Sequence, residues 1–263
     1  MELNHNFKKK FGQNFLTDKN LLESIVSDAG ITKNDVVLEI GAGAGALTEP
    51  LTNHAKKVVS FEIDKDLVSV LEEKFNGKDN IKFVFGDFMS FSQEQISELV
   101  GDKFKVVANL PYYITTPILS KLFEMKNPPE TVVVMVQKEV AERLVATKDS
   151  SAYGYFSAFV SAYANAKVTR QVNRKMFTPM PNVDSAIVRF DLKKNPYEKE
   201  FDLFLQNVFK MKRKTLANNV SSAYAISKTE IENKLANSKY HSSLRADGLS
   251  VEELYEIYCL IFK

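Results

Sequence analysis

The stretch DVVLEIGAGAGALTEPL, residues 35–51, joins an apolar run to a series of alternating glycines. The apolar run is rich in β-branched residues and predicts a strand that is covered on both faces. Gly41, Gly43 and Gly45 follow it, and glycine permits a tight turn and a close approach of the backbone to a ligand. With Ala46 the stretch also satisfies the dinucleotide-binding pattern GxGxxA. The pattern favours a nucleotide-binding loop, although glycines that merely close a strand-helix turn would look the same.

Further strands with the same apolar character are expected along the chain. They cover residues 57–64, 81–87, 104–109 and 131–137. Helical patterns lie between them, and Thr116 followed by Pro117 is typical of a helix N-cap with proline at the first helical position. The alternation of strands and helices predicts a doubly wound α/β sheet with helices on both faces.

The pattern changes after about residue 165. Residues 167–177 and 184–192 read as strands with no clear helix between them, so they could form an antiparallel edge. Residues 193–200 are charged and contain a proline, which suits a linker, and the rest of the chain is helical in pattern. We therefore expect two domains, residues 1–192 and 193–263.

Composition limits the classes to which the chain can belong. Its 263 residues, of which 44% are hydrophobic, suffice for one large core and a smaller appended domain. The single cysteine, Cys259, excludes an intramolecular disulfide and fits a reducing compartment. His5, His54 and His241 are far apart in sequence, so we expect no metal site. Because no run reaches transmembrane length and no signal peptide is evident, we expect a cytoplasmic protein without membrane contact.

Two acidic residues end neighbouring predicted strands. Glu62 ends the second strand, where a carboxylate can accept hydrogen bonds from both ribose hydroxyls of a nucleotide. Sites for NAD and for S-adenosylmethionine share this feature, so Glu62 does not separate them. Asp87 ends the third strand, where a carboxylate can accept a hydrogen bond from an adenine amine. An ordinary helix N-cap is the alternative reading of Asp87.

The end of the fourth strand, Asn109-Leu110-Pro111-Tyr112, carries unusual residues for a strand-helix connection. The exocyclic amine of adenine is a poor nucleophile because its lone pair is delocalised into the ring. The side-chain oxygen of Asn109 and the carbonyl of Leu110 could accept its two N–H groups and localise that lone pair. Pro111 stiffens the turn, and Tyr112 offers a ring on which a base can stack. The alternative is an Asn-Pro turn beside a packing tyrosine.

Longer motifs over nearly the whole chain resemble those of the KsgA-type small-subunit ribosomal RNA adenine dimethyltransferases. They are KKKFGQNFLTD, EIGAGAGALTEPL, FEID, GDF, NLPYYITTPI, MVQKEVAERLVA, SSAYGYFSAF, FTPMPNVDSAIVRF and KMKRKTLANN. The resemblance implies the Rossmann-like sheet of class I S-adenosylmethionine-dependent methyltransferases, with a small all-helical C-terminal domain. The residues expected at the cofactor are Asn14, Leu16, Gly41, Gly43, Glu62, Asp87 and Asn109.

The resemblance also implies a reaction. Methyl groups would pass from S-adenosylmethionine to the exocyclic amines of two adjacent adenosines near the 3′ end of 16S rRNA, in the pre-30S particle. The expected catalytic residues are Asn109, Leu110, Pro111, Tyr112 and Phe177. Phe177 would close the side of the target base opposite Tyr112, unless it is only a core residue. The displacement is direct and requires no catalytic triad, and we expect a monomer.

Three basic clusters are candidates for RNA binding. They are Lys8 to Lys10, then Lys167, Arg170, Arg174 and Lys175, and finally Lys210, Lys212, Arg213 and Lys214. A solvated surface is the alternative for each of them. All three clusters beside one cleft would form a surface that binds RNA phosphates along the chain. Among these, we expect Lys8, Lys9, Lys10, Lys212, Arg213 and Lys214 to contact the RNA.

Other functions remain to be weighed. An Erm-type 23S rRNA adenine methyltransferase would share the sheet and the Asn109 motif. A ribosome-assembly factor could retain the fold for binding alone, with methylation idle. An NAD oxidoreductase would account for Gly41 and Glu62 but would leave Asn109 and Tyr112 without a role.

Overall fold

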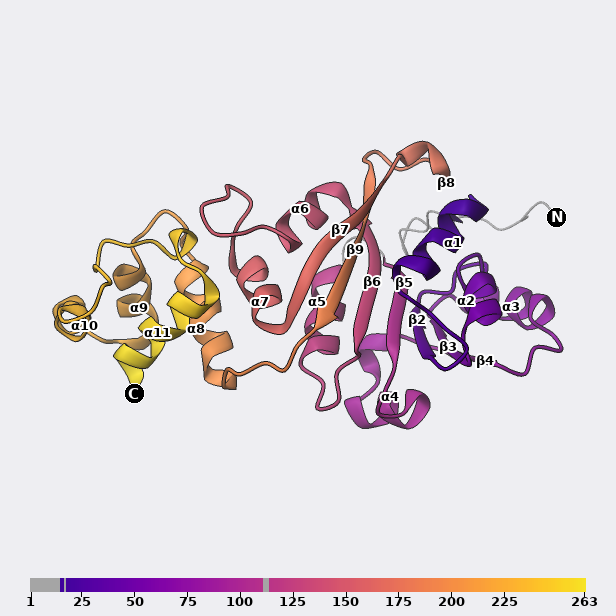
Figure 1. Ribbon diagram of the computed structural model, residues 1–263, viewed down its shortest axis with the longest axis horizontal. Helices are drawn as coiled ribbons and strands as arrows, with labels where there is room; N and C mark the ends of the chain where they lie inside the picture. The colour runs from indigo at the N-terminus through magenta and orange to yellow at the C-terminus, as the bar shows by residue number, and fades with distance from the viewer. Residues whose placement is uncertain (1–14, 17, 111–113) are drawn as a thin grey trace. The chain divides into compact units, whose positions relative to one another are not determined.

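The computed structural model describes residues 15–16, 18–110 and 114–263, and its main element is a seven-stranded sheet (Figure 1). The strand order is β4-β3-β2-β5-β6-β9-β7. The strands are β2 (Val36–Ile40), β3 (Lys57–Glu62), β4 (Ile81–Phe85), β5 (Lys105–Asn109), β6 (Thr131–Gln137), β7 (Ala164–Val172) and β9 (Ser185–Leu192). Each pair from β4 to β6 is parallel, and β9 runs antiparallel to β6. The expected sheet is confirmed, and the five parallel strands have bounds close to those predicted, whereas the strand expected over residues 167–177 is β7, which ends at Val172.

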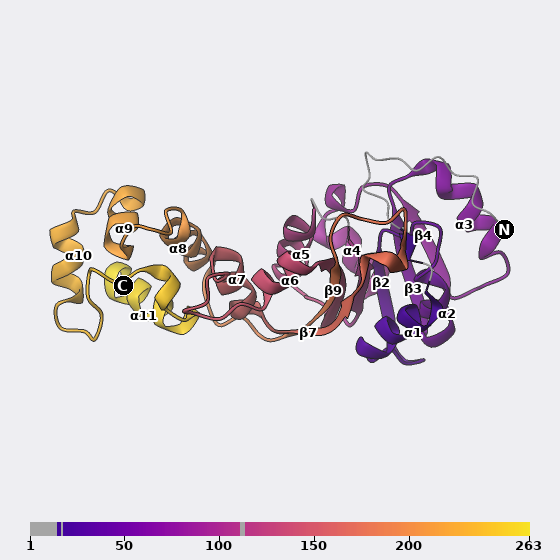
Figure 2. The same cartoon turned by 90° about the horizontal axis from the view of Figure 1, so that it is seen from above.

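Helices cover both faces of the sheet. Figure 2 shows α1 (Lys19–Asp28) and α2 (Thr48–His54) on one side, and α4 (Gln93–Val100) and α5 (Thr115–Phe123) on the other. Ile25 of α1 and Leu51 of α2 share a buried cluster with Val107 of β5. On the opposite face, the ring of Phe123 lies 5.5 Å from that of Phe190. This arrangement explains why the strand sequences are apolar throughout rather than alternating.

The two strands expected to form an antiparallel edge, β9 and β7, are the last two strands on that side of the sheet. β9 pairs with β6, with Val188 opposite Val134, and β7 occupies the edge beyond it. A second sheet, which the sequence analysis did not predict, contains only β1 (Phe15–Leu16) and β8 (Phe177–Thr178). In its antiparallel register, Leu16 is opposite Phe177.

The start of α5 differs from the predicted one. The helix begins at Thr115, with Ile114 as its N-cap, so Thr116 is not the cap and Pro117 is not the first helical residue. Pro117 still lies in the first turn, where a backbone N–H has no partner inside the helix. The proline therefore fits the helix although the predicted cap was wrong.

The described residues group into two compact units. The first extends to Ala141 and includes Lys167–Leu192, and the second comprises Glu142–Ala166 and Lys193–Lys263. One boundary between the units lies after Leu192, where we expected the second domain to begin. Residues 142–166, which we expected in the first domain, group instead with the C-terminal helices. The assignment of the two expected domains to catalysis and RNA docking stays a prediction.

The second unit is helical, in agreement with the pattern of the C-terminal sequence. The helices after β6 are α6 (Lys138–Leu144), α7 (Tyr155–Tyr163), α8 (Lys199–Phe209), α9 (Leu216–Tyr224), α10 (Lys228–Leu235) and α11 (Val251–Phe262). Phe201 and Phe204 are fully buried, and both rings contact Tyr258 edge to face. None of the helices in the described ranges is long and apolar enough to cross a membrane.

Candidate active site

The carboxyl ends of the parallel strands bring several predicted residues to one edge of the sheet. Gly41 follows β2, Glu62 ends β3 and Asn109 ends β5. A side-chain carbon built on Gly41 would lie 3.7 Å from the carbonyl oxygen of Asn109. Next to β3, the N–H of Gly86 donates to the Glu62 carbonyl at 2.8 Å, and Asp87 follows it. This is the edge at which ligands bind in open α/β sheets.

The glycine-rich loop is held by the end of β3. The N–H groups of Gly41 and Ala42 both donate to the carbonyl of Phe61, at 2.8 and 3.0 Å. Gly41 has φ of 85° and Gly45 has φ of 74°, a region that favours glycine. A side-chain carbon on Gly45 would also come within 2.5 Å of the Phe75 ring. Gly45 is thus required by packing as well as by conformation.

The Glu62 carboxylate is fixed by backbone donors. Oε2 accepts from Gly43 N–H at 2.7 Å, and Oε1 accepts from Asp64 N–H at 2.7 Å. The residue is 5% exposed, and burial raises the pKa of its carboxyl, although the two backbone N–H groups oppose this shift. Each carboxylate oxygen can accept more than one hydrogen bond. The geometry therefore leaves acceptor capacity for the two hydroxyls of a ribose.

Glu39 is a further buried carboxylate at this edge, and the sequence analysis missed it. Its Oε2 accepts from the hydroxyls of Thr48 and Ser60, at 2.7 and 2.6 Å, while Oε1 has no hydrogen-bond partner among the described residues. Burial raises the pKa of this carboxyl to about 7, and the nearby Glu62 adds to the shift. Glu39 and Thr48 lie on either side of the glycine loop, so their hydrogen bond joins its two ends. The available signal was one acidic residue inside an apolar strand.

These buried carboxylates favour one kind of ligand. The charge of Glu62 raises the pKa of the Glu39 carboxyl, so negative charge is disfavoured at this edge. A cation bound nearby would relieve this repulsion, whereas an anion would increase it. S-adenosylmethionine carries a positive sulfur and an ammonium group, while NAD carries a pyrophosphate. The carboxylate of Glu62 at this edge is therefore compatible with S-adenosylmethionine, whose positive charges it would compensate.

Asp87 lies at the start of a short 3-10 helix, η3 (Phe88–Ser90). Its Oδ1 accepts from Met89 N–H at 2.9 Å, so the residue is the N-cap of η3, as the alternative reading had it. The carboxylate is exposed, and its second oxygen makes no hydrogen bond to a described residue. The capping role and a role in binding adenine are compatible, because they use different oxygens.

The predicted catalytic residues are only partly within the described ranges. Asn109 is half-buried at the end of β5, opposite Met135 of β6, and Leu110 is buried. Pro111 and Tyr112 lie outside the described residues, as does the predicted cofactor residue Asn14.

Leu16 and Phe177 lie together, although they are far apart in sequence. They are opposite each other in the two-stranded sheet and share one buried cluster, and Phe177 is 4% exposed. Its burial agrees with the reading of a core phenylalanine, and the pairing with Leu16 joins two segments that the sequence analysis assigned to one site.

The basic residues expected to bind RNA differ in whether an acidic side chain neutralises their charge. Arg170 is paired with Asp28 through two hydrogen bonds, at 2.8 and 3.0 Å. Lys212, Arg213 and Lys214 are exposed between α8 and α9 in the second unit. The Lys212 ammonium donates to the Ser151 carbonyl at 2.8 Å. The predicted contacts Lys8, Lys9 and Lys10 lie outside the described residues.

Comparison with known proteins identifies relatives over the whole chain. A family model described as ribosomal RNA adenine dimethylase matches residues 4–261. A Streptococcus thermophilus protein named ribosomal RNA small subunit methyltransferase A is 45% identical over 94% of this chain and 89% of its own length. A Lactococcus lactis protein of the same name is 44% identical over 96% of this chain and 89% of its own.

Solved structures agree with this relationship. A dimethyladenosine transferase from Plasmodium falciparum has a TM-score of 0.77 and 27% identity, covering 92% of this chain and 95% of its own. The 23S rRNA methyltransferase ErmE has a TM-score of 0.71 and 25% identity, covering 95% of this chain and 100% of its own. The two folds are similarly close, so the fold alone does not separate the two kinds of ribosomal RNA substrate.

Proposed function

Because the chain belongs to the ribosomal RNA adenine dimethylase family, we propose that it dimethylates adenosines of small-subunit (16S) rRNA, with S-adenosylmethionine as methyl donor. The observation that carries this proposal is 45% identity, over 94% of the chain, to a protein named for the small subunit. Identity to the 23S enzyme is 25%. The Erm-type alternative is therefore less well supported.

When bound, S-adenosylmethionine supplies a methyl group on a positively charged sulfur. Glu62 would accept the ribose hydroxyls, and the second oxygen of Asp87 would accept the adenine amine. Gly41 and Gly43 would allow close contact with the backbone, and Asn14 and Leu16 would lie against the cofactor. The fixed carboxylate of Glu62, with both oxygens oriented by N–H groups at 2.7 Å, supports this assignment.

Asn109 and Leu110 would act on the target amine. In the first transfer, the side-chain oxygen of Asn109 and the carbonyl of Leu110 would each accept one N–H group, which localises the nitrogen lone pair and directs it at the methyl group. The carbon–nitrogen bond would form as the carbon–sulfur bond breaks, S-adenosylhomocysteine would leave, and the amine would release a proton to water. In the second transfer, one N–H remains for one of these acceptors. The rate would come from positioning and from these two acceptors, because no proton needs to be removed before attack. Tyr112 would stack on the base after the stiff turn at Pro111. Phe177, packed in the cluster that contains Leu16, would form the opposite wall.

The substrate form follows from this geometry. A base inside a duplex cannot reach a pocket at a sheet edge, so the adenosines must be unpaired or flipped out. We propose two adjacent adenosines near the 3′ end of 16S rRNA in a pre-30S particle, modified in the cytoplasm by a monomer. Lys212, Arg213 and Lys214 would bind RNA phosphates, together with Lys8, Lys9 and Lys10.

Mass spectrometry of treated ribosomal particles tests the proposal. Small-subunit and large-subunit particles that lack adenine dimethylation are incubated with the protein and isotopically labelled S-adenosylmethionine. We expect labelled N6,N6-dimethyladenosine in 16S rRNA only. Label in 23S rRNA would support the Erm-type alternative, and cofactor binding without label in either RNA would support an assembly factor with idle chemistry.

A further inference from the structure

Lys121, in the last turn of α5, makes an unusual set of contacts with the turn that follows Asp87. Its ammonium donates to the carbonyls of Phe88 at 3.1 Å, Met89 at 2.9 Å and Phe91 at 2.5 Å. The ammonium also lies 5.1 Å from the centre of the Phe88 ring. An ammonium group has three N–H donors, so these carbonyls use all of them.

The opposite side of this turn is held by aromatic packing. The Phe61 ring contacts Phe88 at 5.3 Å and Phe91 at 5.0 Å, both at an interplanar angle of 86°. Phe61 immediately precedes Glu62, and its carbonyl holds the glycine loop. The turn between Asp87 and Phe91 is thus fixed against β3 by rings and against α5 by one cation.

The electrostatics agree with this geometry. Burial lowers the pKa of the Lys121 ammonium, whereas the charge of Asp87 raises it, so the two residues are close enough to interact. The end of a helical turn presents carbonyl oxygens without partners inside the turn, and a cation there is favourable. Without the ammonium, the Met89 and Phe91 carbonyls would lose this donor and the Phe88 carbonyl would keep only the Phe91 N–H at 3.3 Å, so the turn would lose its attachment to α5.

We propose that Lys121 is a positioning residue for the cofactor, which holds the Asp87 turn so that the carboxylate faces the adenine amine. The inference rests on the proposed function, because it takes Asp87 as the residue that binds adenine. Lys121 touches no reacting atom and acts through Asp87.

Cofactor binding by variants tests this role without any turnover. Calorimetry compares S-adenosylhomocysteine with S-inosylhomocysteine, in which a carbonyl replaces the adenine amine. For K121M, which keeps a long apolar side chain, we expect affinity for the adenine compound to fall about tenfold, as for loss of a hydrogen bond to a charged group. Affinity for the inosine compound should change little, so the preference for adenine is reduced. K121R retains donors and should recover most of that preference.

Lys57 provides a matched control. It starts β3, at the opposite edge of the sheet, and its ammonium donates to the Leu99 carbonyl at 2.7 Å. K57M also removes an ammonium-carbonyl contact and should leave both affinities unchanged. The thermal unfolding midpoint of each variant separates loss of folding from loss of binding.

A double-variant cycle with D87N completes the test. Asparagine can still cap Met89 N–H with its oxygen, but its nitrogen then replaces the acceptor for the adenine amine. If Lys121 acts through Asp87, K121M/D87N should bind within about threefold of D87N alone, because the two effects are coupled. Full additivity, or a K121M variant with unchanged preference for adenine, would overturn the inference while leaving the cofactor site intact. Unchanged binding by D87N would overturn both the Asp87 assignment and this inference.

Discussion

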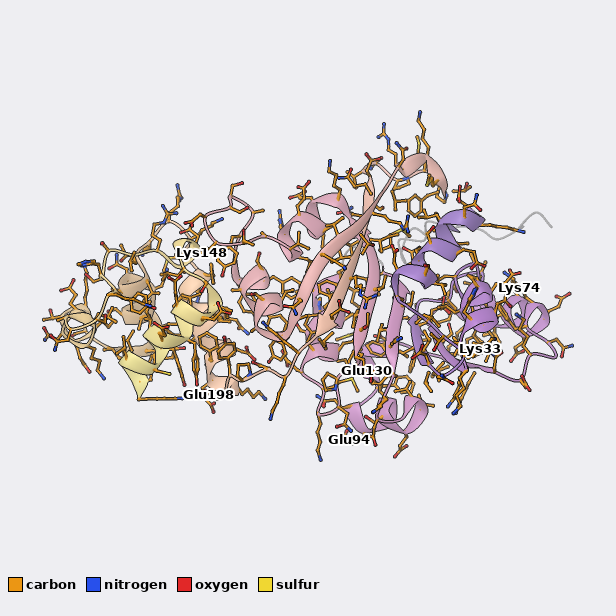
Figure 3. The ribbon with its side chains drawn as sticks, viewed as in Figure 1. Lys33, Lys74, Glu94, Glu130, Lys148 and Glu198 are labelled. Atoms are coloured by element: carbon orange, nitrogen blue, oxygen red, sulfur yellow. The ribbon has the colours of Figure 1, made fainter. Side chains whose placement is uncertain are left out.

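Glu39 in the first unit and Glu198 in the second unit each accept two hydrogen bonds, yet the pKa values of their carboxyl groups shift in opposite directions. Glu39 is fully buried and accepts only from neutral hydroxyls, which leaves the pKa of its carboxyl raised to about 7. Glu198, labelled in Figure 3, accepts from Tyr255 and from the Lys263 ammonium, each at 2.7 Å. This cation beside a partly exposed carboxyl holds the pKa of Glu198 well below its ordinary value.

The difference reflects what surrounds each charge. Beside the glycine loop, the buried carboxylate of Glu62 faces only backbone N–H groups, so part of its charge is left for a ligand to compensate. In the helical unit, charges at the surface pair with each other. Lys148, labelled in Figure 3, lies 2.9 Å from Glu253. Functional chemistry is therefore expected at the sheet edge, while surface pairs contribute little.

The largest expected effect is at Asn109. Replacement by alanine removes one of the two proposed acceptors, and loss of one such preorganised polar group typically costs about 1,000-fold in rate. Single-turnover methylation of small-subunit particles measures the rate, and calorimetry with S-adenosylhomocysteine shows whether the cofactor still binds. Transfer at the normal rate with N109A would remove the basis of the proposed mechanism.

The second prediction concerns Glu39 and pH. In the folded protein this carboxyl keeps its proton up to about pH 7, but in the unfolded chain it loses it near 4.5. The free energy of unfolding should therefore fall as pH rises through this window, by roughly 3 kcal/mol from this group. In E39Q the amide oxygen can still accept from Thr48 and Ser60, and this pH dependence should be absent.

Urea unfolding of wild type and E39Q at several pH values between about 5 and 8 measures the difference. E198Q serves as the control, because the low pKa of Glu198 places its titration outside this window. Equal pH slopes for wild type and E39Q would mean that Glu39 is charged in the folded protein.

A smaller effect is expected at the exposed cations of the second unit. Charge reversal at Lys212 and Arg213 should weaken binding to small-subunit particles by about tenfold or more and reduce its salt dependence, because phosphate contacts release counterions. Affinity for S-adenosylhomocysteine should be unchanged. Lys228 is an exposed lysine of the same unit, 3.8 Å from Glu232, and K228E is the control for a nonspecific effect of charge. Unaltered particle binding by K212E/R213E would exclude this surface from RNA docking.

Much of the sheet could be predicted from sequence because parallel strands covered on both faces leave a strong local signal. The runs ending at Glu62 and Asn109 are long and apolar, so their ends, where ligands bind, could be located as well. β1 and β8 contain two residues each and are defined by a pairing between distant segments, such as Leu16 with Phe177. No local pattern encodes such a pairing.

For a related reason, the roles of Glu39 and Lys121 could not be predicted from the sequence. Both depend on partners from other elements, Ser60 of β3 for the first and the turn after β4 for the second. A single acidic or basic residue in an element does not reveal which distant groups it contacts. Chemistry that follows from residue type was therefore predictable, whereas the contacts that support it required the structure.

The smallest expected effect is at Glu198, whose carboxyl pKa shifts in the opposite direction from that of Glu39. Its low folded-state pKa means that the ion pair stabilises the protein above about pH 4.5, and that this contribution is lost as pH falls through the folded-state pKa. For E198Q we expect a loss below about 1 kcal/mol near neutral pH, since the pair is partly exposed. The loss should shrink in high salt and in acid. Urea unfolding of E198Q and E39Q in low and high salt checks this, because the buried carboxyl of Glu39 accepts its hydrogen bonds from neutral hydroxyls, which salt does not screen. A salt-insensitive effect of E198Q, or one that grows in acid, would show that the contrast between the two carboxylates is not set by exposure.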